Sequence, residues 1–162
     1  MTNKYQNVLY FHGLESKPGG HKVHYLNYEV DFVKAPEMDY TDPNLFEDWL
    51  DYIEREEPDL IIGSSMGGYF AMLLATHTKT KVLAFNPALH SRTIEIKGAK
   101  SGNEKLEGLV ILGKKDDVID PKKTLKELDK FDGLSVSIEE KMAHRVPFPI
   151  FIDGVDHFLL TQ

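Results

Sequence analysis

The chain has 162 residues, of which 26 are acidic, 19 are basic and none is cysteine, so its formal net charge is −7. This length fits a single domain over residues 1–162. The acidic balance disfavours binding to nucleic acid or to an anionic membrane surface. The lack of cysteine excludes disulfides, a thiol nucleophile and cysteine-based metal sites. Neither a signal peptide nor a run of about 18 apolar residues is present, so we expect a cytoplasmic protein with no membrane insertion.

Short apolar runs, each as long as a buried β-strand, recur along the chain. They cover residues 7–11, 30–33, 59–63, 81–85, 108–112 and 135–138. The runs are rich in Val, Ile and Leu rather than strictly alternating, which is typical of strands buried on both faces of a parallel sheet. Only the last run alternates polar and apolar residues, so it is expected at an edge of the sheet.

Segments with the apolar spacing of helices separate these runs. They cover residues 18–27, 43–57, 66–77 and 147–160, and a further helix is expected to begin at Pro121. Asp42 and Asp120 each precede a proline, a pairing typical of an N-cap followed by the first helical residue. The alternation predicts an α/β fold, a three-layer α/β/α sandwich with a mainly parallel, roughly six-stranded sheet.

Residues 90–107 follow neither pattern, being polar and interrupted by glycine. We interpret this segment as a short cap-like excursion over the carboxyl ends of the strands, the edge at which sheets of this kind bind ligands.

The strongest local motif is Gly63-Ser-Ser-Met-Gly67, which matches G-x-S-x-G with Ser65 at its centre. It follows an apolar strand and opens a helix, the context that a nucleophile elbow requires. We therefore predict Ser65 as a nucleophile. The alternative is an ordinary strand-to-helix turn in which serine and glycine serve only as caps.

A serine nucleophile needs a histidine base and an orienting carboxylate, which in this kind of sheet follow in the order Ser, Asp, His. The fifth predicted strand ends before Asp116, Asp117 and Asp120. Asp120 is expected to cap the next helix and Asp117 to be a solvated turn residue. Asp116 is therefore the predicted acid.

Two of the seven histidines are candidates for the base. His144 lies a few residues after the sixth predicted strand, and His157 lies near the end of the chain. His144 is favoured because it leaves enough chain for a last helix, but His157 stays as the alternative base. The other five are expected to shape a loop, lie on the surface, end a helix or have no assigned role: His12, His21, His24, His77 and His90.

An acyl-transfer site also needs backbone N–H groups that stabilise an oxyanion. One donor is expected at Met66, directly after the nucleophile, and the other at Leu14 in the glycine-containing loop after the first strand. This loop lacks the G-x-x-x-x-G-K-[ST] pattern of a phosphate-binding loop, so a nucleotide-binding protein is disfavoured.

Four segments, in this order, resemble the YqiA-like esterases, small members of the α/β-hydrolase superfamily. The segments are residues 9–18 (LYFHGLESKP), 63–69 (GSSMGGY), 85–88 (FNPA) and 116–120 (DDVID). The resemblance implies a minimal α/β-hydrolase fold and hydrolysis of short acyl esters or acyl-CoA-type thioesters. It implies Ser65 as nucleophile, Asp116 as acid, Leu14 and Met66 as oxyanion donors, and a base at the position of His144. The sequence lacks the glycines that the family carries before this histidine.

The expected protein is thus a carboxylesterase or thioesterase that uses a catalytic triad and an acyl-enzyme, acts on a small molecule, and needs no metal or cofactor. An anionic substrate would need the nearby cations Lys17, Lys22 and Arg145. A histidine base must be neutral, and the ordinary histidine pKa is about 6.5, so activity should rise with pH through that region. The alternative function is a catalytically inactive binding module on the same fold.

Overall fold

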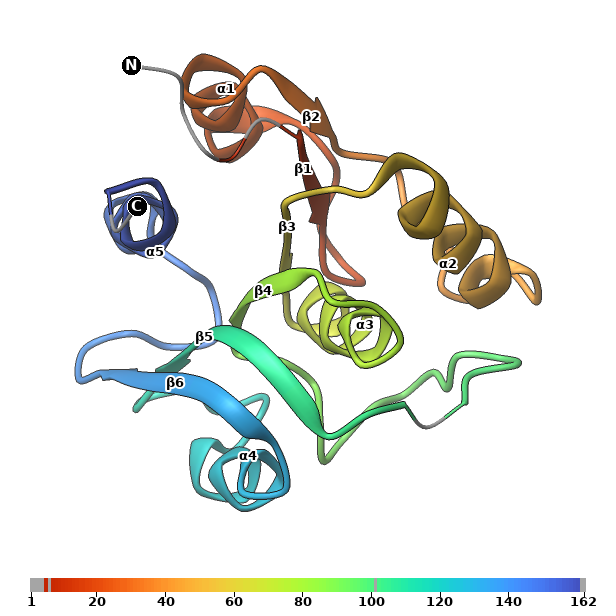
Figure 1. The fold of residues 1–162 in the computed structure, drawn as a ribbon. Coiled ribbons are helices and arrows are strands. Elements are labelled where there is room, and N and C mark those ends of the chain that lie inside the picture. The colour runs from red at the N-terminus through yellow and green to blue at the C-terminus, as the bar shows by residue number, and fades with distance from the viewer. Residues whose placement is uncertain (1–4, 6, 101, 161–162) are drawn as a thin grey trace.

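The structure, a computed structural model, describes residue 5, residues 7–100 and residues 102–160. Within them the chain alternates strands and helices, except that β5 follows β4 with no helix between them (Figure 1). The strands are β1 (Asn7–Phe11), β2 (Phe32–Lys34), β3 (Leu60–Ser64), β4 (Lys81–Phe85), β5 (Lys105–Gly113) and β6 (Asp132–Glu139). The helices are α1 (Gly20–Glu29), α2 (Leu45–Glu56), α3 (Met66–Ala75), α4 (Pro121–Leu128) and α5 (Phe148–Leu160).

The six strands form one parallel sheet in the order β2-β1-β3-β4-β5-β6, with β6 at an edge as predicted. The chain moves from β1 outward to β2, and then from β3 outward in the opposite direction. Such a reversal leaves a crevice at the carboxyl ends of β1 and β3, where sheets of this type bind ligands. The site is therefore expected beside the ends of these two strands.

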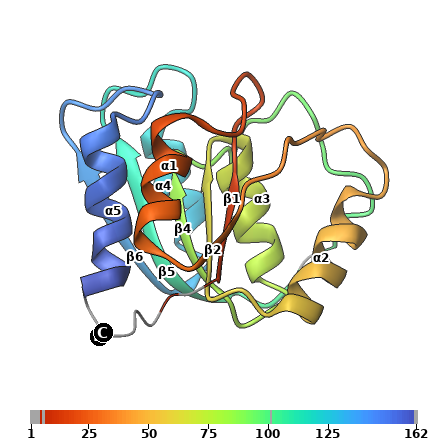
Figure 2. The same ribbon diagram turned by 90° about the horizontal axis from the view of Figure 1, so that it is seen from above.

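Helices cover both faces of the sheet, so the predicted three-layer sandwich is confirmed (Figure 2). Leu9 and Phe11 of β1 point to the face that carries α2, α3 and α4, while Val8 and Tyr10 point to the face that carries α1 and α5. Phe11 packs against the rings of Phe70 and Trp49, with centroids 5.2 and 5.1 Å apart. Full burial of one such side chain stabilises the fold by about 1.5–3 kcal/mol.

The two Asp-Pro signals for helix starts have different outcomes. Asp120 caps α4 as predicted, because its carboxylate accepts a hydrogen bond from the N–H of Lys122. The prediction that Asp42 caps the next helix is wrong, since α2 begins three residues later, at Leu45. Asp42 instead accepts from the N–H of Asn44 at 2.9 Å and so builds a turn that precedes the helix.

The weakest predicted strand, residues 30–33, lies further along the chain in the structure. Helix α1 extends to Glu29 and Val30 forms its C-cap, so β2 covers only Phe32–Lys34. β5 and β6 both begin earlier than predicted, because Lys105 already pairs with Asp132. The irregular segment between β4 and β5 consequently covers residues 86–104.

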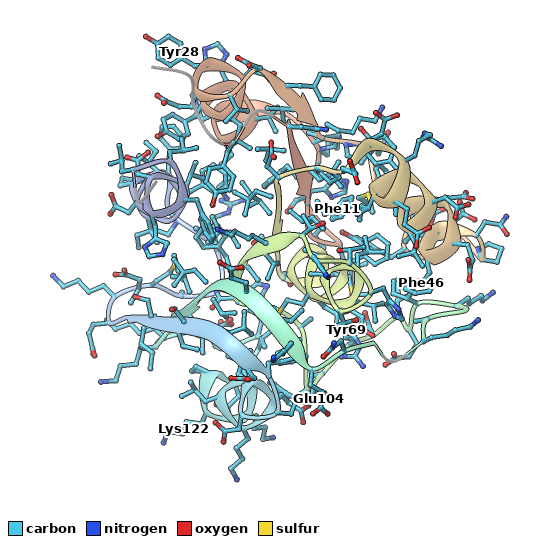
Figure 3. The ribbon with its side chains drawn as sticks, in the orientation of Figure 1. Phe11, Tyr28, Phe46, Tyr69, Glu104 and Lys122 are labelled. Atoms are coloured by element: carbon cyan, nitrogen blue, oxygen red, sulfur yellow. The ribbon has the colours of Figure 1, made fainter. Side chains whose placement is uncertain are left out.

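This irregular segment runs along α3. Near its start the N–H of Ala88 donates to the carbonyl of Ser65, and near its end the N–H of Asn103 donates to the carbonyl of Thr76. Between them the guanidinium of Arg92 lies 4.0 Å from the ring centroid of Tyr69, a side chain on the flank of α3 (Figure 3). Only the first part of the segment therefore lies at the carboxyl edge of the sheet, and the remainder returns along the helix to the start of β5.

None of the helices in the part of the chain that the structure describes is both long enough and apolar enough to cross a membrane.

Candidate active site

Ser65 connects β3 to α3 in a conformation that side chains rarely adopt. Its φ is 56° and its ψ is −117°. Its N–H donates to the carbonyl of Phe85 at 2.9 Å, and its carbonyl accepts from the N–H groups of Tyr69 and Ala88 at 3.0 and 3.1 Å. Such a conformation costs about 1–3 kcal/mol and persists only where the surroundings enforce it. A strained serine between a strand and a helix is the geometry of a nucleophile elbow.

Gly67, in the first turn of α3, allows this helix to approach the end of β1. A Cβ at this position would lie 2.1 Å from the carbonyl oxygen of Phe11 and 2.7 Å from that of His12. No larger residue fits without moving the backbone. The side chain of Ser65 makes no capping hydrogen bond to the helix. The motif therefore brings the start of α3, at the end of β3, against the end of β1, an approach that an ordinary helix cap would not require.

Asp116, His144 and Ser65 form a continuous row of side chains. Nδ1 of His144 lies 2.9 Å from Oδ2 and 3.1 Å from Oδ1 of Asp116, and Nε2 of His144 lies 3.0 Å from Oγ of Ser65. The Asp116 side chain is 1% exposed and that of His144 is 25% exposed. The three residues follow three different strands, β5, β6 and β3. The structure thus brings together the residues predicted as acid, base and nucleophile.

Backbone hydrogen bonds fix the carboxylate of Asp116. Its Oδ1 accepts from the N–H groups of Val118 and Ile119, both at 2.9 Å. An ionised carboxylate only accepts hydrogen bonds, so Nδ1 of His144 must carry the proton between them. Nε2 is then left as an acceptor for the hydroxyl of Ser65. Asp117 is exposed, as predicted for a turn residue.

The structure does not bring the alternative base, His157, to Ser65. This residue lies exposed on α5, and its ring contacts that of Phe158. His21 and His24 are exposed on α1, and among the described residues no group of three His, Cys, Asp or Glu side chains is arranged to hold a metal ion. His77 contacts the carbonyl of Lys100 at 2.7 Å and so connects the end of α3 with the irregular segment.

His12 is buried and shapes the loop after β1. Its Nδ1 lies 2.6 Å from the carbonyl oxygen of Gly13, and its Nε2 accepts from the N–H of Met38 at 2.8 Å. Because Nε2 accepts, Nδ1 must be the protonated nitrogen that donates to Gly13. The hydroxyl of Tyr40 donates to the carbonyl of His12. Met38 and Tyr40 carry no sequence signal for this function, since they lie in a stretch without periodicity.

The loop after β1 also passes directly beside the serine. A Cβ on Gly13 would lie 3.4 Å from the Cβ of Ser65. The next residue is Leu14, the first predicted oxyanion donor. Met66, the second, is the first residue of α3, and an N–H at this position has no acceptor within the helix. The partial positive charge of the helix N-terminus adds to its attraction for an anion.

Of the three predicted cations, Lys22 is half-buried and Lys17 and Arg145 are exposed. Nζ of Lys22 lies 5.7 Å from the ring centroid of Phe151. Burial, and secondly the charge of Arg145, lower the pKa of Lys22. The charged form of Lys22 is thus less favourable than that of an exposed lysine.

Solved structures with the same fold cover nearly the whole chain. A monoacylglycerol lipase from Paleococcus ferrophilus has a TM-score of 0.71 and 14% identity, covering 96% of this chain and 94% of that one. An alpha/beta hydrolase from the metagenome of sediments from the Mar Chica lagoon, Morocco, has a TM-score of 0.66 and 15% identity, covering 96% of this chain and 90% of that one. An S-formylglutathione hydrolase from Agrobacterium tumefaciens has a TM-score of 0.61 and 16% identity, covering 98% of this chain and 84% of that one. These similarities show an α/β-hydrolase fold.

No curated protein matches the sequence. The model of an uncharacterised protein family, UPF0227, matches residues 7–105. The match includes β1, the elbow at Ser65 and the whole irregular segment, and ends before Asp116 and His144. It covers more than half of the chain and agrees with the resemblance inferred from the motifs: the chain belongs to UPF0227, the YqiA family, and has the α/β-hydrolase fold.

Proposed function

We propose that the protein is a serine hydrolase that cleaves carboxylic esters or thioesters through an acyl-enzyme. The observation that carries this proposal is the unbroken row from Asp116 through His144 to Ser65, with 2.9 Å between Oδ2 of Asp116 and Nδ1 of His144 and 3.0 Å between Nε2 of His144 and Oγ of Ser65. Each contact joins a donor to an acceptor in the order that base-assisted attack by a serine requires.

In the first step His144 removes the proton from Ser65, and Oγ forms a bond to the carbonyl carbon of the substrate. The carbonyl oxygen becomes an oxyanion, which the N–H groups of Leu14 and Met66 stabilise. His144 then gives the proton to the leaving alcohol or thiol, and the acyl group remains on Ser65. Asp116 holds the imidazole in the tautomer that can accept this proton, and it stabilises the imidazolium.

In the second step a water molecule takes the place of the alcohol. His144 accepts its proton, the hydroxide oxygen attacks the acyl carbon, and the acid is released as the proton returns to Ser65. The mechanism needs no metal and no organic cofactor, and its substrate is a small molecule. Esters and thioesters are both included, because the solved structures with this fold carry names of a lipase and of an S-formylglutathione hydrolase.

A substrate panel tests this proposal. p-Nitrophenyl acetate represents short esters, and an acetyl thioester of a neutral thiol represents thioesters. We expect hydrolysis that is lost in Ser65→Ala and that falls as the solution is acidified, because a protonated His144 cannot accept the serine proton. A rate that is flat from pH 5 to 8, or activity retained in Ser65→Ala, would contradict the mechanism. Failure to hydrolyse any member of the panel would favour an inactive binding module.

A further inference from the structure

Asn86 occupies a special position that the proposed chemical steps do not use. It follows the last residue of β4, is 1% exposed, and adopts a φ of 43°. Asn tolerates this left-handed conformation better than most residues. Its N–H donates to the carbonyl of Ile111 in β5 at 3.0 Å. The backbone is thereby held at the carboxyl edge, and the side chain is fully enclosed.

The side-chain amide of Asn86 connects the two segments that carry the acid and the base. Its Nδ2 donates to the carbonyl oxygens of Ala143 and His144, at 3.1 and 2.9 Å. Its Oδ1 accepts from the N–H of Gly113, the last residue of β5, at 2.8 Å. The carbonyl of Gly113 in turn accepts from the N–H of Asp116. A single amide thus joins the backbone of His144 to the strand end that leads to Asp116.

These two segments approach each other closely. A Cβ on Gly113 would lie 2.4 Å from the carbonyl oxygen of Met142 and 2.6 Å from that of Ala143. His144 itself lies between β6 and α5, outside regular secondary structure. A backbone hydrogen bond from the N–H of Lys115 to the carbonyl of Met142, at 3.0 Å, holds the loop two residues before His144. At His144 itself the backbone carbonyl is held by the amide of Asn86.

The residues on either side of Asn86 hold the nucleophile. The carbonyl of Phe85 accepts a hydrogen bond from the N–H of Ser65, and the N–H of Ala88 donates to the carbonyl of Ser65. The segment Phe85–Ala88 therefore contacts the backbone of Ser65, of His144 and of the strand end before Asp116.

We propose that Asn86 is a positioning residue, whose amide sets the place of His144 relative to Asp116 and Ser65. The inference rests on the proposed function for its effect on rate. Without the two donated bonds, the loop around His144 is free to shift, and a displacement of about 1 Å is enough to lower a rate by about 100-fold. Asn86 itself touches no reacting atom.

Two substitutions test the inference by different chemistry. Asn86→Asp keeps the shape and the acceptor for Gly113, but it places a carboxylate oxygen against the carbonyls of Ala143 and His144. Asn86→Ser removes the amide altogether. We expect both to lower kcat for p-nitrophenyl acetate by about 100-fold with little change in KM. The matched control is Asn27→Asp, since Asn27 is an exposed residue whose amide also donates to a backbone carbonyl, at 3.0 Å, on α1. It should leave kcat unchanged.

A double-mutant cycle separates positioning from a general loss of structure. If Asn86 acts through His144, Asn86→Asp has no further effect on the residual rate of His144→Ala. All rates are measured well below the unfolding midpoint of each variant. An unchanged kcat in both Asn86 variants, or an equal loss in the presence and absence of His144, would overturn the inference.

A spectroscopic measurement decides the inference even if the protein proves inactive. The proton between Nδ1 of His144 and Asp116 should give a far-downfield NMR resonance in the wild type. We expect the resonance to shift or disappear in Asn86→Asp and Asn86→Ser and to stay in Asn27→Asp. Retention at the wild-type position in both Asn86 variants would contradict a positioning role. If the resonance is present in the wild type and lost in the Asn86 variants, but the wild type hydrolyses no ester, the positioning role stands and only the proposed function is contradicted.

Discussion

Neighbouring backbone groups, rather than the reacting side chains themselves, fix the geometry of the candidate site. Asp116 is held by two N–H groups of its own turn, and Ser65 by hydrogen bonds to the segment after β4. His12 holds the carbonyl of Gly13. In a trans peptide the C=O and the next N–H point in opposite directions, so this contact also orients the N–H of Leu14. Single residues therefore offer specific tests.

Asp116→Asn tests the orientation of the base. The amide oxygen can still accept from Val118 and Ile119, so the fold should keep most of its stability. The amide NH₂ instead faces Nδ1 of His144 and favours the wrong tautomer. We expect kcat for p-nitrophenyl acetate to fall by about 10³–10⁴-fold, with a thermal midpoint close to that of the wild type. A loss of less than tenfold in a folded variant would show that Asp116 is not the orienting acid.

Two substitutions of His12 separate its two hydrogen bonds. The amide of Asn at this position can replace Nδ1 and donate to Gly13, whereas the longer Gln reaches toward Met38 instead. Each variant should lose about 1–3 kcal/mol of stability, because one buried group is left without a partner. We expect His12→Asn to keep the higher ester hydrolysis rate of the two. The reverse order, measured with unfolding controls, would contradict a role of His12 in orienting the Leu14 N–H.

At the scale of elements, the carboxyl ends of neighbouring strands supply the whole site. β1 leads to the Gly13 loop, β3 to Ser65, β4 to Asn86, β5 to Asp116 and β6 to His144. Helices fix these ends: α3 begins at the serine, and α5 begins four residues after the histidine. Regular elements thus determine the position of each connection, and the connections carry the candidate functional groups.

Helix α4 offers a control at this scale, because the hydrogen bond of its cap involves none of Ser65, Asp116 and His144. Asp120→Ala removes the hydrogen bond from Asp120 to the N–H of Lys122. We expect the free energy of unfolding to fall by about 1 kcal/mol and the ester hydrolysis rate to stay within about twofold of the wild type. Denaturant unfolding measures the free energy, and p-nitrophenyl acetate hydrolysis measures the rate. A large loss of rate at unchanged stability would show that α4 affects the site.

The strand interiors and the elbow were predictable because apolar runs and the glycine–serine pattern are local signals. The position of β2 and the route of residues 86–104 were not, since they depend on contacts with β1 and with Tyr69 of α3. The start of α2 was not either, because Asp42 forms a turn instead of a cap. Chain order placed Ser65, Asp116 and His144 among the candidates. The choice between His144 and His157 depends on where α5 begins. Asn86 lay within a segment that resembles the family, but its role was not predictable, because its contacts join segments that lie far apart in the sequence.

At the scale of the whole molecule, a buried tyrosine limits stability at alkaline pH. Tyr10 is 6% exposed and packs against Phe151. Burial raises the pKa of Tyr10 from 10.0 to about 12. Between these values the unfolded chain has lost the phenolic proton while the folded chain still holds it, so the free energy of unfolding falls as pH rises. The loss begins near pH 10 and amounts to about 3 kcal/mol above pH 12.

Tyr10→Phe tests this contribution, since it removes the ionisable group and keeps the ring. We expect nearly unchanged stability at pH 8 and a smaller loss than in the wild type between pH 10 and 12. Urea unfolding at several pH values measures both. Parallel curves for the two proteins across this range would show that Tyr10 is not the group responsible.

The most direct test of the central claim, an activated Ser65, is labelling with a fluorophosphonate followed by intact-mass measurement. This probe reacts with a serine whose neighbours already activate it. We expect one adduct on the wild type, none on Ser65→Ala, a greatly reduced amount on His144→Ala and an unchanged amount on His157→Ala. Loss of labelling in His157→Ala with retention in His144→Ala would contradict the assigned base. A folded wild-type protein that takes up no label would contradict the account as a whole.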